Sequence, residues 1–219
     1  MHLNGVEIED TFAEGFKMWG ARLIITALTA GWARTAAQVT TGFATSVIGC
    51  GCEAGIEGPL QPAETPDGRP GVSVLFFVSS SKAMEKLLLM RIGQGVMTCP
   101  TTACYNGLAG DVQLKLGGSL RYFGDGFQSS KLLDGRRQWR IPVMEGEFVI
   151  DETFGMCKGV GGGNFLILGE SVEATLAAAE AAVTAMQQVP AVILPFPGGI
   201  VRSGSKVGAR YKFLTASTN

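Results

Sequence analysis

Two glutamates in the stretch "CEAGIEGP" have the type and spacing to act as an acid or a base. Glu53 and Glu57 stand four residues apart, beside glycines, just past an apolar run. Most exposed carboxylates are simply solvated. A carboxylate that lines a cleft can have its pKa raised toward the working range of a general acid or base. The sequence assigns no catalytic residue outright, and Glu53 and Glu57 are its two candidates.

A cationic, glycine-rich loop follows the apolar run "AVILPF" near the end of the chain. No acidic residue occurs after Glu180, whereas Arg202, Lys206, Arg210 and Lys212 fall close together. One interpretation is that acidic partners lie elsewhere in the fold or on another subunit. The other is an anionic ligand, with Arg202 and Lys206 as contacts.

The same loop nearly fits a phosphate-binding loop. Gly199 and Gly204 have the right spacing after a predicted strand, but Ser205 stands where the lysine belongs and Lys206 comes one place late. No amphipathic helix follows to supply an anion-binding N-terminus. A nucleotide-binding protein is therefore the weaker alternative. A backbone turn against another ligand, which would include Ser203 and Gly204, and a purely structural turn both stay open.

The run "KGVGGGNF" invites comparison with a dinucleotide-binding fingerprint. That fingerprint follows a strand and opens a helix, whereas this run precedes the apolar stretch "NFLIL" and has the wrong spacing. The alternatives are a tight connection or a backbone surface lying against a substrate. In the second case the contacts would come from Gly161, Gly162 and Gly163, with Lys158 and Asn164 as the polar side chains.

The single histidine and the spacing of the cysteines argue against several kinds of catalytic and metal site. The only histidine is His2, which argues against serine–histidine triads and histidine-ligated zinc. The five cysteines lack the spacing of zinc knuckles, and their odd number favours free thiols in a reducing compartment. We therefore expect no metal and a cytoplasmic location.

The composition is that of an apolar chain with few charges. Among 219 residues, 46% are hydrophobic and 17% charged, with a formal net charge of −1. Near-neutral charge argues against nucleic-acid binding. The longest charge-free stretch contains prolines and a glycine pair that would not span a bilayer as a helix, and the acidic N-terminus does not look like a signal peptide. A surface so poor in charge favours burial against other subunits.

The first half of the chain predicts a split β-α-β arrangement, which needs strand, helix, strand, strand, helix, strand. The strands are expected at 22–28, 46–56, 72–78 and 98–106. The first helix should bury Trp32, Ala36, Val39, Phe43 and Val47, and the second should bury Met84, Leu87, Leu88 and Ile92.

The second half predicts a related but unfinished series. Strands are expected at 117–127, 137–144, 147–154, 164–168 and 191–196. Ser171 should cap an alanine-rich helix that buries Val172, Leu176, Ala179, Val183 and Met186 and stops before Pro190. We therefore expect an α+β chain of two ferredoxin-like lobes, at 1–115 and 116–219, with the second lobe incomplete. Another chain would complete its sheet, or the sequence is cut short.

Eight segments, in order along the chain, resemble the formylmethanofuran–tetrahydromethanopterin formyltransferase family: "NGVEIEDTFAEGF", "CEAGIE", "ETPDGRPGV", "FGDGF", "EGEFVIDETFG", "KGVGGGNFLILGES", "PFPGGIVRSGSKVG" and "YKFLTASTN". The resemblance implies two ferredoxin-like lobes. It also implies transfer of a formyl group between N5 of tetrahydromethanopterin and the amine of methanofuran or methylofuran. In bacteria this step belongs to the oxidation of formaldehyde to formate, and the enzyme works as a subunit of a formyltransferase/hydrolase complex.

The resemblance also limits which functional residues can be carried over to this chain. Family members continue past Asn219, and the glutamate credited with catalysis lies in that part, so no residue here inherits its role. A non-catalytic scaffold subunit of the complex is therefore an open alternative. Both carriers have anionic tails, which would suit Arg202, Lys206 and Lys158. The partners implied are further copies of the chain, other subunits of the complex, or both.

Overall fold

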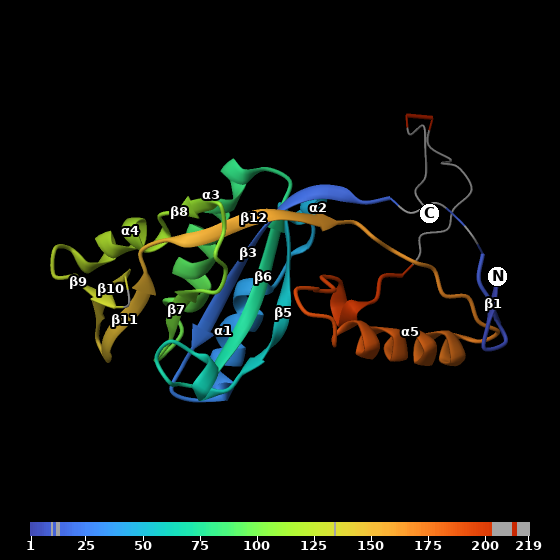
Figure 1. Ribbon diagram of the computed structural model, residues 1–219, viewed down its shortest axis with the longest axis horizontal. Helices are drawn as coiled ribbons and strands as arrows, with labels where there is room; N and C mark the ends of the chain where they lie inside the picture. The colour runs from blue at the N-terminus through green and yellow to red at the C-terminus, as the bar shows by residue number, and fades with distance from the viewer. Residues whose placement is uncertain (10, 12–13, 134, 203–211, 214–219) are drawn as a thin grey trace.

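The computed structural model describes residues 1–9, 11, 14–133, 135–202 and 212–213. Helices and strands alternate through the first half, and strands dominate the middle (Figure 1). The strands are β1 (His2–Leu3), β2 (Val6–Glu7), β3 (Phe16–Thr26), β4 (Thr45–Ser46), β5 (Cys52–Leu60), β6 (Gly71–Val78), β7 (Ala103–Asn106), β8 (Val112–Leu114), β9 (Ser129–Leu133), β10 (Arg136–Val143), β11 (Gly146–Asp151) and β12 (Phe154–Gly161).

The helical elements are of three kinds. The α-helices are α1 (Ala30–Thr41), α2 (Val47–Cys50), α3 (Ser81–Arg91), α4 (Leu116–Leu120) and α5 (Val172–Met186). A π-helical turn, η2 (Ile92–Val96), continues α3. The 3₁₀ turns are η1 (Pro62–Glu64), η3 (Arg121–Gly124) and η4 (Pro197–Gly199).

One large mixed sheet organises the molecule. Eight strands follow the order β4-β5-β6-β3-β7-β11-β10-β9, and β12 pairs with both β3 and β8. Every pair is antiparallel except β11 with β7. The long strand β3 is paired along both edges, because β6 borders one side while β7 and β12 share the other. The fold is therefore α+β, built around a strand that lies early in the sequence.

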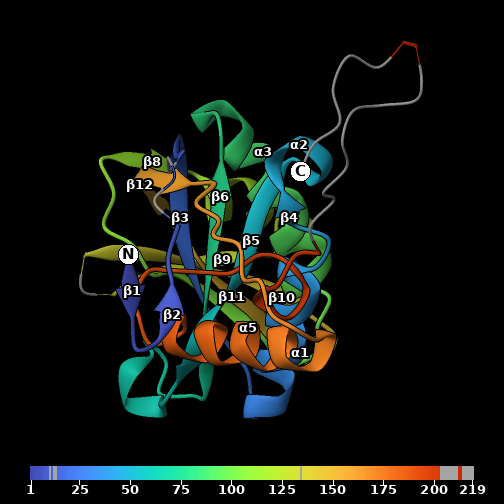
Figure 2. The same cartoon turned by 90° about the vertical axis from the view of Figure 1, so that its right-hand side faces the viewer.

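The hydrophobic core lies between this sheet and the helices α1, α3 and α4. Alternate residues of β3 and β6, such as Leu23, Ile25, Val74 and Phe76, are fully buried on that side. Helix α5 lies apart from the other helices, beyond β5 (Figure 1), and crosses the front of the molecule when it is turned by 90° (Figure 2). Helices α1, α3 and α4 all cover the same face of the sheet. We call the other face, which these three helices leave uncovered, the open face.

The strands around Leu23 and Val74 and the helix over Met84 and Leu88 form where the sequence predicts them. The inward face predicted for the first helix is confirmed at Ala36 and wrong at its other positions. Ala33, Ala36 and Ala37 are buried in α1, whereas Trp32, Val39 and Phe43 are 45%, 60% and 82% exposed, and Val47 belongs to α2. The helix approaches its neighbours so closely that a Cβ at Gly95 would collide with Thr40, and only small side chains fit there.

Three predicted strands are not strands in the described structure. Residues 117–127 form α4 and η3 instead, because Leu116 and Leu120 are buried one helical turn apart. Residues 164–168 and 191–196 pair with no strand, and the extended segment lies earlier, as β12. The strand expected to begin at Ser46 starts at Cys52 after the short helix α2.

The alanine-rich helix is confirmed, but its buried stripe is not. Ser171 caps α5 by accepting a hydrogen bond from the Ala174 amide at 3.1 Å. Only Val183 of the predicted stripe is buried, while Val172 and Leu176 are 78% and 48% exposed. Few described elements pack on α5, so its apolar side chains face outward.

Candidate functional site on the open face of the sheet

The open face carries the polar side chains of the central strands. Because strand residues alternate between faces, Arg22 of β3 and Ser73 of β6 point away from the buried Leu23 and Val74. Glu53 and Glu57 of β5 lie on the same open face; a register irregularity between Ile56 and Gly58 lies beside Glu57. The two predicted glutamates therefore share one surface with a cation and a hydroxyl.

Glu57 is held by four hydrogen bonds from three different segments. The Nε and Nη2 atoms of Arg22 donate to its two carboxylate oxygens, each at 2.7 Å. Ser73 Oγ donates at 2.6 Å and the amide of Ala191 at 2.9 Å. Burial alone would raise the pKa of Glu57, but these donors and the charge of Arg22 outweigh it and lower the pKa. The raised pKa considered for a catalytic carboxylate is thus wrong for Glu57.

Glu53 has a different environment. It pairs in register with Phe77 on β6, and its carboxylate accepts no hydrogen bond from the described residues. A Cβ built on Gly161 would lie 3.4 Å from Glu53 Oε2. The structure thus brings together one catalytic candidate, Glu53, and one predicted substrate-binding residue, Gly161.

Glycines around Glu53 accommodate two large side chains. The Phe77 ring lies over Gly20 and Gly159, where a Cβ on either residue would be 3.0 Å from ring atom Cε1. Met18 occupies the corresponding space beside Gly161. The first part of the glycine-rich run, up to Gly161, therefore forms the end of β12, and its glycines pack against aromatic and thioether groups.

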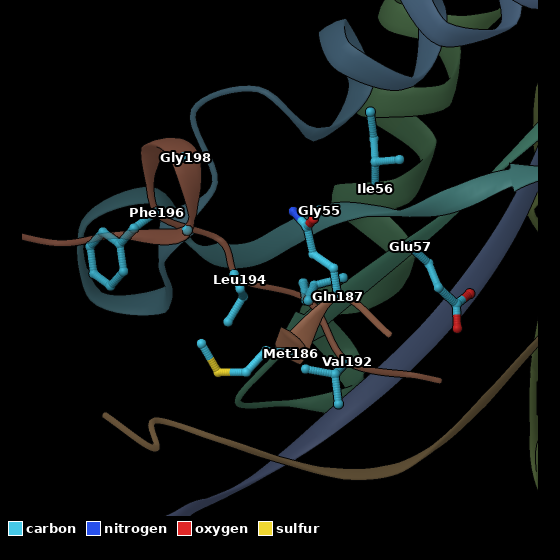
Figure 3. Close-up of a pocket in the computed structure, with 11 residues that line it drawn as sticks. Gly55, Ile56, Glu57, Met186, Gln187, Val192, Leu194, Phe196 and Gly198 are labelled. Atoms are coloured by element: carbon cyan, nitrogen blue, oxygen red, sulfur yellow. The ribbon is translucent and has the colours of Figure 1, made fainter. Parts of the chain in front are cut away.

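The segment 191–200 lies on the open face beside β5 (Figure 3). It borders a hollow of about 220 Å³, which Gly55 and Glu57 share with Met186, Val192 and Leu194. Ile193 packs so closely on Gly55 that an added Cβ would lie 3.0 Å from the Ile193 Cβ atom. Segments far apart in the sequence thus form one surface around Glu57.

The other predicted contacts that the structure describes lie outside the hollow beside Glu57. Lys158 of β12 is exposed and has the parity of the core residues Phe154 and Met156, so it lies on the opposite face from Gly161. Gly162, Gly163 and Asn164 are exposed beyond the end of β12. Arg202 is exposed at the far end of the segment that contains Ala191. Ser203, Gly204 and Lys206 lie outside the described residues.

Sequence reasoning missed the partners of Glu57 and a second hollow. Arg22 is the single cation in the apolar run "RLIITAL", and such an isolated charge signals a buried carboxylate partner. The second hollow, of about 680 Å³, includes Asp151 and Arg136 in its lining. Asp151 is 2% exposed and accepts hydrogen bonds from Arg136, the Asn106 amide and Gln138.

The described residues offer neither a membrane-spanning helix nor a cluster of metal ligands. No helix there combines the length and apolarity needed to cross a membrane. No group of three or more histidine, cysteine, aspartate or glutamate side chains there is arranged to hold a metal ion.

Similarity to known proteins extends along the whole chain. The family described as formylmethanofuran-tetrahydromethanopterin formyltransferase matches residues 1–143, and its proximal lobe matches residues 146–219. The formylmethanofuran–tetrahydromethanopterin formyltransferase of Methylococcus capsulatus is 62% identical over all of this chain and 74% of that protein. A subunit of the formyltransferase/hydrolase complex of Methylorubrum extorquens is 55% identical over 99% of this chain and 72% of that protein.

Solved structures give the same relationship. The formyltransferase/hydrolase complex from Methylorubrum extorquens, crystallised with methylofuran, contains a chain that superposes with a TM-score of 0.94 at 55% identity, over all of this chain and 73% of that one. The formyltransferase from Methanosarcina barkeri superposes with a TM-score of 0.92 at 52% identity, over all of this chain and 74% of that one. The chain therefore belongs to the formylmethanofuran-tetrahydromethanopterin formyltransferase family.

Proposed function

We propose that this protein transfers a formyl group between N5 of tetrahydromethanopterin and the primary amine of a methanofuran-type carrier. The observation that carries the proposal is the 62% identity, over the full length of the chain, to a relative named for that reaction. The carriers act as substrates. The relatives named for formyl transfer support a place in one-carbon metabolism. We propose that the reaction there belongs to the oxidation of formaldehyde to formate.

Formyl transfer between two amines needs no covalent nucleophile, metal or histidine. The amine nitrogen attacks the formyl carbon, a tetrahedral intermediate forms, and the bond from that carbon to N5 breaks. The attacking amine loses a proton and N5 gains one. Such a transfer uses a donor for the oxyanion and a carboxylate that moves protons. Glu53 is the carboxylate of the open face that the described residues leave without hydrogen bonds.

The substrate contacts remain proposals. We assign carrier binding to Gly161 at the end of β12 and to Gly162, Gly163 and Asn164 just beyond it, with Arg202, Ser203, Gly204 and Lys206 toward the anionic tails. Lys158, the other predicted contact, lies on the opposite face from Gly161, so we leave it out of this group. The approach of Gly161 to Glu53 supports the first group. The exposed position of Arg202 supports its availability to an anion.

The division into ferredoxin-like lobes, the assembly with other chains and the cellular location are proposals too. The order β5-β6-β3-β7, antiparallel throughout, is that of a ferredoxin-like sheet and supports the first lobe at 1–115. The second lobe, at 116–219, stays a prediction. We propose assembly with further copies of the chain or with other subunits of a formyltransferase/hydrolase complex. The unpaired state of all five cysteines supports a cytoplasmic location.

The test is a formyl-transfer assay. Purified protein is incubated with formyl-tetrahydromethanopterin and methanofuran, and formylmethanofuran is measured by liquid chromatography and mass spectrometry. We expect product at a rate proportional to protein concentration. Absence of product, both alone and with the other subunits of the complex, would favour the non-catalytic scaffold.

A further inference from the structure

Glu57 connects three parts of the open face. Its carboxylate accepts both Arg22 donors from β3, the Ser73 hydroxyl from β6 and the Ala191 amide from the segment after α5. Both carboxylate oxygens are engaged at hydrogen-bonding distances of 2.6 to 2.9 Å. A carboxylate so occupied, with its pKa lowered, is poorly suited to exchange protons with a substrate.

The bond to Ala191 holds an unusual backbone conformation. Ala191 has a φ of 62°, in the left-handed region that residues with a Cβ seldom adopt. Such a conformation persists where surrounding contacts over-determine it. Here the amide of Ala191 points into the carboxylate of Glu57, so the strained residue and its hydrogen-bond acceptor form one unit.

The attachment of residues 191–200 to the sheet depends on the bond between Glu57 and Ala191. Backbone hydrogen bonds within 191–200 are local, from Gly199 to Phe196 and from Ile200 to Pro197. Among the described residues, the Glu57–Ala191 bond is the hydrogen bond that ties this segment to the sheet. The contact of Ile193 with Gly55 adds a close apolar approach next to it.

We infer that Glu57 is a positioning residue, which fixes 191–200 on the open face and so sets the direction in which the chain reaches Arg202. The part of this inference that concerns the carriers rests on the proposed function. Fixing the segment favours carrier binding, since the approach to Arg202 is organised before a ligand arrives. Glu57 then governs affinity for the carriers and leaves proton transfer to other groups.

The first test is hydrogen–deuterium exchange, read by mass spectrometry on peptides covering 187–202. Glu57→Gln keeps the side-chain shape but removes the charge and turns one acceptor into a donor. We expect about tenfold faster exchange at 191 and its neighbours, since a charge-assisted hydrogen bond is lost. Glu147→Gln, which alters an exposed ion pair with Arg140, is the matched control and should leave this peptide unchanged. Unchanged exchange in Glu57→Gln overturns the inference, whether or not the protein transfers formyl groups.

The second test separates KM from kcat in the formyl-transfer assay. We expect Glu57→Gln to raise the KM for at least one carrier about tenfold and to leave kcat within about twofold. A large loss of kcat at unchanged KM would make Glu57 part of the chemical step and overturn the inference. Faster exchange with unchanged KM would overturn its link to the carriers.

A second variant covers the case in which Glu57→Gln fails to fold, as judged by circular dichroism. Gly55→Ala leaves the Glu57 carboxylate intact but places a Cβ 3.0 Å from Ile193. We expect the same rise in KM and the same faster exchange at 191–200. If the exchange rises and the KM does not, the position of the segment has no bearing on carrier binding.

Discussion

The phenyl ring of Phe77 on β6 reaches across β3 to Gly159 on β12, where a Cβ would lie 3.0 Å from its Cε1 atom. A methyl group there would press on the ring. We expect Gly159→Ala to lower the free energy of unfolding by about 1–2 kcal/mol, measured by urea denaturation. Gly155→Ala should cost more, because its Cβ would meet the rigid carbonyl of Leu108. Gly49→Ala in α2, with open space around it, is the control and should cost nothing.

The lowered pKa of Glu57 predicts how stability depends on pH. A carboxyl whose pKa is lower folded than unfolded stabilises the protein above its ordinary value of 4.5. That contribution is lost as pH falls from about 4.5 through the folded-state pKa. We expect the free energy of unfolding to decline over this range, and to decline less steeply in Glu57→Gln. Equal slopes in the two proteins would contradict the prediction.

The cysteines should differ in their reactivity. Hydrogen bonds from the Thr45 side chain and the Ser46 backbone lower the pKa of Cys50, whereas complete burial raises that of Cys104. Because thiolates are the nucleophiles, iodoacetamide should modify Cys50 first and spare Cys104 in the folded protein. Peptide mapping by mass spectrometry measures the order. Cys50→Ser should remove the fastest phase, and early labelling of Cys104 would be inconsistent with its burial.

The two faces of α1 should respond oppositely to substitution. Val39 is 60% exposed, so Val39→Gln should change the free energy of unfolding by no more than about 0.5 kcal/mol. Ala36 is fully buried against the sheet, and Ala36→Leu should cost about 1–3 kcal/mol through overpacking. Chemical denaturation of both variants checks the assignment. The reverse order would contradict the burial of Ala36 and the exposure of Val39.

The buried carboxylate of Asp151 should be more important for stability than an exposed one. It accepts hydrogen bonds from Arg136, Gln138 and the Asn106 amide. Asp151→Asn would turn one donor–acceptor contact into a donor–donor contact and cost about 1–3 kcal/mol. Glu147→Gln, on the same strand but exposed, should cost less than about 1 kcal/mol. Thermal unfolding of the two variants compares them.

The sequence predicts elements well where one periodicity dominates. Val72 to Val78 forms the buried strand expected from its branched and aromatic residues, and Ser171 starts the expected helix. In α1 the helix was predicted but its face was not. Hydrophobic spacing favours large residues such as Trp32, while close packing admits only small ones such as Ala33.

Non-local contacts account for most of what the sequence missed. From the sequence, the glycines of β12 fit a tight connection or a surface against a substrate. The structure shows that Phe77 and Met18, from other strands, occupy the space beside them. Glu53 and Glu57 look equivalent in "CEAGIEGP". Arg22, thirty-five positions away, is what distinguishes them, and no local pattern joins it to Glu57.

The double pairing of β3 has a consequence for synthesis on the ribosome. Its N-terminal half emerges early but finds β12, the partner on its second edge, only after Gly161 has been translated. Until then this part of β3 has an edge whose backbone amides and carbonyls are unpaired. Such an edge can pair wrongly with neighbouring nascent chains. Arrested translation intermediates that stop short of Phe154 should therefore recruit holdase chaperones, and longer ones should release them.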